Sequence, residues 1–170
     1  MHYRWTKNGL NSSSIIRGHE LEIRRATVLD KAAWVHNMLD RLQPLSRIDQ
    51  ETFTSDLYPA AAESYLRRAL EALLDLGRHI CAKGFNRGCQ EYKEISYCLH
   101  EHGVLDRELA KKMRILAGYR NRMVHFYFEI TPEELYAILQ NDLQDIKEVL
   151  EGLLAWLQEQ GILEDPKHVK

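Results

Sequence analysis

Residues 131–161 read TPEELYAILQNDLQDIKEVLEGLLAWLQEQG, and this stretch is the clearest indication of the fold class. Thr131 is a typical helix N-cap, Pro132 suits the first helical position, and Glu134 is placed to close a capping box. Apolar residues then recur at intervals of four and three, the period of one helix face, at Leu139, Leu143, Ile146, Leu150, Leu153 and Leu157. The stretch therefore predicts one long helix that ends at Gly161.

The same apolar period predicts four more helices upstream. Their ranges are about 27–43, 59–83, 90–102 and 106–124. Thr27 is a plausible N-cap for the first of them, and Pro44 should end it. Gly84 is a natural stop for the second helix, and Asp106 can cap the fourth.

This order of elements predicts an all-α fold, an up-and-down bundle of four to five helices. A chain of 170 residues fits one domain, which we place at residues 27–163. The polar, turn-rich residues 1–26 are expected to form a flexible extension, and residues 164–170 a C-terminal tail.

Composition limits the classes of partner. The formal net charge is −2, so the chain has no overall positive field, and a nucleic acid would have to be held by a local basic patch. No apolar run approaches the roughly 20 residues of a membrane span, and the N-terminus has no apolar signal segment. We therefore expect a cytoplasmic protein with no membrane partner.

The chain has three cysteines, Cys81, Cys89 and Cys98, with His79, His100 and His102 close to them in sequence, so a zinc site must be considered. An odd number argues against a disulfide framework. Structural zinc sites usually show tight pairs such as C-x2-C, and the sequence has none. We expect reduced thiols packed in helix faces, and no metal site.

Residues 119–127, YRNRMVHFY, hold the residues best suited to chemistry. Arg120 and His125 are five positions apart, so on an ideal helix they diverge by about 140°. Asn121 and His125, four positions apart, share a face. A site that uses both Arg120 and His125 therefore needs a bent helix, a curled arginine or a second copy of the chain across a dimer interface.

The residue types of this segment suit a phosphodiester. Arg120 offers a permanent planar cation for phosphate oxygens, and His125 can move a proton near neutral pH. Asn121 can orient the imidazole, and Tyr127 can stack on a base or bind a phosphate. Such a reaction needs no metal and no cofactor. The alternative from the residues alone is a solvated basic helix end next to core aromatic residues and a hydrogen-bonded histidine.

The segment resembles the R-N-x3-H-x-Y signature of HEPN-domain toxins of the HepT group. Residues 65–80 and 92–105 also resemble helices of that group, and the likeness covers about residues 27–157. The resemblance implies an all-helical homodimer, a metal-independent endoribonuclease that cleaves RNA by 2′-OH transesterification. It also implies a type VII-like toxin neutralised by a nucleotidyltransferase antitoxin of the MNT type.

Site residues follow from the same resemblance. Arg120 and His125 match the catalytic pair and Asn121 the supporting polar position. Tyr127 matches the tyrosine that such antitoxins modify with AMP. Arg122 is not a required position of the signature, and we expect only a weak contact with RNA phosphate from it. Two alternatives stay open: a non-catalytic helical module that binds RNA, a nucleotide or a partner protein, and a purely structural dimer.

Overall fold

The computed structural model describes residues 15–16, 19–20, 22–124 and 130–164, and these are almost entirely helical. The helices are α1 (Arg25–Leu45), α2 (Gln50–Ser55), α3 (Tyr58–Phe85), α4 (Tyr92–Glu101), α5 (Arg107–Val124), α6 (Pro132–Asn141) and α7 (Leu143–Glu159). Two short strands, β1 (Ile15–Ile16) and β2 (His19–Glu20), pair antiparallel. The all-α prediction is confirmed, but the described residues form seven helices where four or five were expected.

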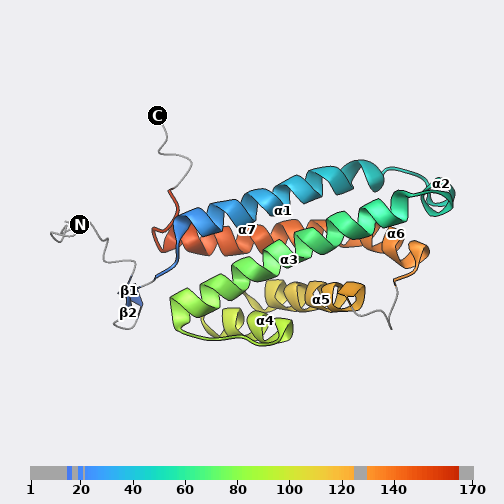
Figure 1. The fold of residues 1–170 in the computed structure, drawn as a ribbon. Coiled ribbons are helices and arrows are strands. Elements are labelled where there is room, and N and C mark those ends of the chain that lie inside the picture. Colours follow the sequence, from blue (N-terminus) through green and yellow to red (C-terminus); the bar gives the residue numbers. More distant parts are fainter. Residues whose placement is uncertain (1–14, 17–18, 21, 125–129, 165–170) are drawn as a thin grey trace.

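Helix α3 is the centre of the bundle. It contacts each of the other helices, and in Figure 1 it runs between α1 and α7 on one side and α4 and α5 on the other. Five of its leucines are completely buried, namely Leu66, Leu70, Leu73, Leu74 and Leu76. Among the described helices, none has the length and apolar composition needed to cross a membrane.

The start of α1 differs from the prediction. The helix begins at Arg25, two residues before the expected cap Thr27, and Arg24 occupies the N-cap position without a side-chain cap. Instead, the Arg24 backbone N–H donates to Nε2 of His79 on α3, 3.1 Å away. Burial lowers the pKa of His79 and so favours the neutral form that can accept this bond. A tertiary contact thus replaces the local cap.

Two predicted helix ends were also wrong. Pro44 does not end α1 but lies inside its last turn, and the helix continues to Leu45. Helix α3 passes through Gly84 to Phe85, and Asn86 ends it in the left-handed conformation with φ of 52°. Asparagine is among the residues that tolerate this conformation, so it can replace glycine there.

Two features account for the extra helices. Asp49 caps α2 by accepting from the Thr52 backbone N–H at 2.9 Å, and the buried Phe53 anchors this short helix. The long C-terminal helix is broken at Asp142, whose φ of −113° lies outside helical geometry. The Asp142 carboxylate accepts from the hydroxyl of Tyr119 on α5, at 3.2 Å, so the break is tied to a neighbouring helix.

Gly77 is required where α3 meets α4 and α5. A Cβ at this position would lie 2.7 Å from Met113 Cε and 2.8 Å from Ile95 Cγ2, both of them in fully buried side chains. We expect Gly77→Ala to lower the free energy of unfolding by about 1–3 kcal/mol because it overpacks the core. Gly118→Ala is the matched control, since a Cβ there meets nothing within 4 Å. It should stabilise the helix by up to about 1 kcal/mol. If urea unfolding gave Gly77→Ala a higher free energy of unfolding than wild type, the result would contradict this packing.

Candidate active site and nucleic-acid interface

Arg120 lies near the C-terminal end of α5 and is held from two sides. Its side chain is only 19% exposed, and its NH2 group is 3.4 Å from Oε1 of Glu71 on α3. Its guanidinium also lies over the ring of Tyr92, the first residue of α4, at 4.5 Å from the ring centre. Contacts with two other helices thus fix the direction of this cation.

The hydrogen-bonding capacity of Arg120 is largely unused. A guanidinium has five N–H donors, and the long contact with Glu71 is its one hydrogen bond among the described residues. Its Nε is buried and has no partner in the described part of the chain. Glu71 is also shared with Arg67, whose NH1 lies 3.4 Å from the same oxygen. Arg120 is therefore a positioned cation with donors available for an anion.

Arg122 has a different environment from Arg120. It pairs with Glu134 of α6 through both guanidinium NH groups, and this pairing holds the pKa of Glu134 below its usual range. The Thr131 hydroxyl accepts from the Glu134 backbone N–H as predicted, at 3.2 Å, but the Glu134 carboxylate binds Arg122. The charge of Arg122 is thus already paired, which favours a role in joining α5 to α6.

Asn121 is exposed on α5, next to the buried side of Arg120. It continues a row of exposed residues spaced four and three apart, the spacing of one helix face: Arg107, Lys111, Arg114, Gly118 and Asn121. The other two predicted site residues, His125 and Tyr127, lie outside the described residues. The geometry of the proposed pair Arg120–His125 therefore stays a prediction.

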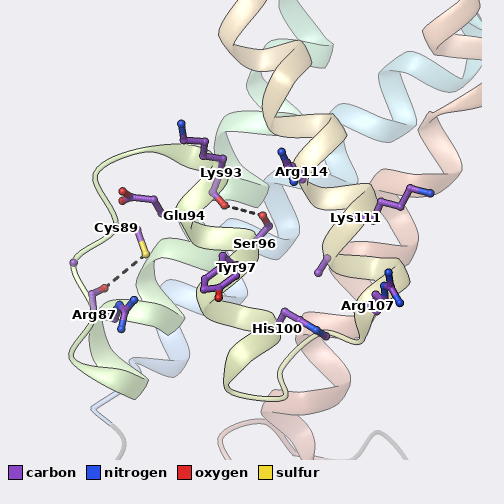
Figure 2. Close-up of a pocket in the computed structure, with 12 residues that line it drawn as sticks. Arg87, Cys89, Lys93, Glu94, Ser96, Tyr97, His100, Arg107, Lys111 and Arg114 are labelled. Carbon is purple, nitrogen blue, oxygen red and sulfur yellow. Dashed lines mark hydrogen bonds between the residues drawn. The ribbon is translucent and has the colours of Figure 1, made fainter.

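A pocket of about 580 Å³ is lined by the connection from α3 to α4, by α4 and by α5. Figure 2 shows its cationic side chains, which are Arg87, Lys93, Arg107, Lys111 and Arg114. The one carboxylate in its lining is Glu94, and that carboxylate already accepts from the backbone N–H groups of Gln90 and Glu91 at 2.8 and 3.2 Å. Lys93 and Arg87 are also paired outside the lining, with Glu91 at 2.7 Å and Glu101 at 3.9 Å. The other three cations make the pocket basic in a chain whose net charge is −2.

The cations of α5 fall into two groups. Lys112 faces α7, where it pairs with Asp145 at 2.7 Å and with Glu148, and these carboxylates raise its pKa. Arg107, Lys111 and Arg114 line the pocket of Figure 2 and form no ion pair with any described residue. We call these three residues the α5 basic face. Asn121 lies about 10 Å further along the helix axis than Arg114, the last residue of this face.

Several of these features were not predicted from the sequence. Nothing local in the sequence shows that Glu71 and Tyr92 meet Arg120, because the three residues lie on three different helices. The 4,3 spacing of Arg107, Lys111 and Arg114 was available as a signal for the α5 basic face. A local patch of this kind is what a nucleic-acid partner requires, given the net charge.

The fold and these sites describe a small helical protein with a cationic helix face and, on the same helix, a positioned arginine. Residues 35–153 match the family model described as Ribonuclease HepT-like, and the chain belongs to this family. A curated relative, the tRNA nuclease HepT of Aphanizomenon flos-aquae (strain 2012/KM1/D3), is 28% identical over 107 residues. That alignment covers 62% of this chain and 73% of the relative.

Solved structures show the same fold. A tri-AMPylated Shewanella oneidensis HEPN toxin in complex with an MNT antitoxin has a TM-score of 0.69 at 22% identity, covering 76% of this chain and 97% of that chain. YutE from Bacillus subtilis, described as a cytosolic protein of unknown function, has a TM-score of 0.72 at 17% identity, covering 84% of this chain and 96% of that chain. The likeness confirms the HEPN-like helical bundle.

Proposed function

We propose that this chain is a metal-independent endoribonuclease and the toxin of a toxin–antitoxin pair. The observation that carries the proposal is Arg120, a mostly buried guanidinium near the C-terminal end of α5, whose Nε has no partner among the described residues. Membership of the HepT-like ribonuclease family supports the same activity. RNA is an extended polyanion, so three cations that form no ion pair with a described residue, on the same helix as a positioned arginine, suit its backbone.

The proposed mechanism uses two side chains of the motif. His125 acts as the general base that removes the proton from a ribose 2′-OH, and the resulting alkoxide attacks the adjacent phosphorus. Arg120 binds the phosphate oxygens and stabilises the charge that develops on them. The bond to the 5′-oxygen breaks, leaving a 2′,3′-cyclic phosphate and a 5′-hydroxyl. Asn121 supports the site, and the positive charge is supplied by Arg120 without a metal ion.

We also propose a homodimer that brings the two copies of the motif together. Arg120 and His125 diverge by about 140° on one ideal helix, and a two-fold interface juxtaposes the same patch of both subunits. Light scattering at micromolar concentration should therefore give twice the 19.9 kDa mass of one chain. A monomer would contradict this arrangement.

The proposed partner is a nucleotidyltransferase antitoxin of the MNT type, acting in the cytoplasm in a type VII-like system. The Shewanella oneidensis HEPN toxin is described in such a complex and as tri-AMPylated. We infer by analogy that an antitoxin of this kind binds and modifies the present chain. The modified residue would be Tyr127.

Adenylylation of Tyr127 should silence the enzyme. Transfer of AMP to its hydroxyl adds bulk and a negative phosphodiester close in sequence to His125, and the anion can pair with Arg120 in place of substrate phosphate. Intact mass after co-expression with a cognate nucleotidyltransferase should show one or more added AMP units on wild type and none on Tyr127→Phe. Neutralisation of toxicity without any mass gain would point to inhibition by binding alone.

The runner-up function is a non-catalytic module that binds RNA, a nucleotide or its partner protein. An RNA cleavage assay separates the two, with tRNA as the first substrate because the curated relative is a tRNA nuclease. Wild type should cleave in the presence of EDTA, and His125→Ala should be reduced by about 10²–10⁴-fold. Equal cleavage by His125→Ala would contradict the proposed mechanism, and RNA binding without cleavage by wild type would favour the module.

A further inference from the structure

All three cysteines of the chain converge at one place. Cys81 comes from α3, Cys89 from the connection before α4, and Cys98 from α4, and their sulfur atoms lie within 4.8 Å of one another. Cys81 and Cys98 are buried, whereas Cys89 is half-buried and lines the basic pocket. The spacings of seven and eight intervening residues gave no sign of this cluster, so the prediction of separately packed thiols did not foresee it.

The local hydrogen bonds do not explain the convergence. The Cys81 sulfur lies 3.9 Å from the Ile95 carbonyl oxygen, and the Cys89 sulfur 4.0 Å from the Arg87 carbonyl oxygen, so both contacts are long. Apolar packing alone would accept a thiol anywhere in the core. Three thiolates on one zinc ion, with Zn–S bonds of about 2.3 Å, lie about 3.8 Å apart in tetrahedral geometry. The observed triangle needs only a modest contraction to reach that geometry.

We propose that Cys81, Cys89 and Cys98 form a binding site for a zinc ion. Thiolate sulfur is the ligand type that favours this ion, and a set of three leaves one tetrahedral position. Solvent from the pocket fills that position, because Cys89 lies on the pocket wall. Glu94 is already used in the capping of α4.

His102 stands at the edge of the cluster and is not one of its ligands. Its Nδ1 lies 3.8 Å from the Cys98 sulfur and 2.8 Å from the Cys98 carbonyl oxygen, to which a protonated Nδ1 can donate. Its ring stacks on Phe85 at a centroid distance of 4.0 Å. These contacts hold Nδ1 of His102 at the Cys98 backbone carbonyl, and the group of potential metal ligands consists of the three sulfur atoms. We therefore assign His102 a supporting position.

The proposed zinc site is structural. It would join the end of α3, the connection that carries Arg87 and Cys89, and α4. The connection and α4 form one wall of the basic pocket in Figure 2. Three thiolates and one zinc ion would leave a single negative charge, beside a wall whose cations Arg87 and Lys93 are already paired with Glu101 at 3.9 Å and Glu91 at 2.7 Å.

Zinc titration of the reduced full-length protein tests the proposal without any RNA. After removal of metal by a chelator, calorimetry should show one Zn²⁺ per chain with a dissociation constant below about 1 μM. Zinc should also raise the melting temperature. Cobalt(II) in place of zinc should give the near-ultraviolet charge-transfer band of thiolate ligation.

Cys89→Ser is the informative variant because this half-buried residue lies in a connection and can be changed with little effect on packing. It should bind zinc at least about 100-fold more weakly, since loss of an outer-shell partner alone costs 10–100-fold. Ser96→Ala, in the same pocket lining, is the control and should bind as wild type does. Equal binding by Cys89→Ser would assign the metal to other residues and overturn the site. No uptake by reduced wild type, or a disulfide in place of zinc binding, would overturn it as well.

Discussion

Arg120→Ala should lower RNA cleavage by about 10²–10³-fold while the helical circular dichroism signal stays unchanged, as expected for loss of one donor group to a transition-state anion. The reason lies in the position of this guanidinium, which Glu71 and Tyr92 hold while most of its donors bind no described residue. Arg120→Lys keeps the charge but not the planar fork, so it should recover only part of the rate.

Arg122→Ala is the matched control for Arg120. It removes the same charge from the same turn of α5, but from a side chain already paired with Glu134. We expect this variant to lose some stability and to keep cleavage within a few-fold of wild type. Equal losses in both variants would show that bulk positive charge at the helix end matters, and not the placement of Arg120. Full activity of Arg120→Ala would remove it from the mechanism.

Neutralising the α5 basic face should give the second large effect. The triple variant Arg107→Gln, Lys111→Gln, Arg114→Gln, made in a His125→Ala background to prevent cleavage, should bind RNA about 100-fold more weakly at 0.1 M salt. The slope of log K against log salt should become shallower by about 2, because three phosphate contacts each contribute about 0.7 for a single strand.

The control for this triple variant carries the same change in net charge elsewhere. The control variant combines Arg25→Gln, Arg41→Gln and Arg47→Gln. These three arginines are on or next to α1, which Figure 1 places on the other side of α3 from α4 and α5. Binding should then stay close to wild type. Similar losses in the two triple variants would mean that net charge alone governs affinity. Retained RNA binding with lost binding to an antitoxin would assign the α5 basic face to the protein partner.

Much of the fold could be predicted because its signals are local. The apolar spacing located the long helices, and the Thr131 cap, the Asp106 cap and the turn at Gly103 are all present. The errors occur where a distant contact competes with a local signal. His79 supplies the acceptor that allows α1 to begin at Arg25, and Tyr119 binds the Asp142 carboxylate at the break between α6 and α7.

The candidate site was only partly predictable for the same reason. The motif pointed to Arg120 through its residue types, but the environment of Arg120 depends on α3 and α4, far away in sequence. The pairing of Arg122 with Glu134 likewise joins two helices. The three cysteines are the clearest example of a feature that local sequence could not predict, because only the packing of α3 against α4 brings them together.

The 3′ end of the cleavage product tests the central claim most directly. Wild-type protein and a tRNA substrate should yield fragments that end in a 2′,3′-cyclic phosphate, with a 5′-hydroxyl on the other fragment. A single 2′-deoxy substitution at the cleaved nucleotide should prevent cleavage there, because it removes the attacking hydroxyl. Fragments that end in a 3′-hydroxyl and a 5′-phosphate, or cleavage that continues at the 2′-deoxy position, would contradict catalysis by His125 and Arg120 through the 2′-OH.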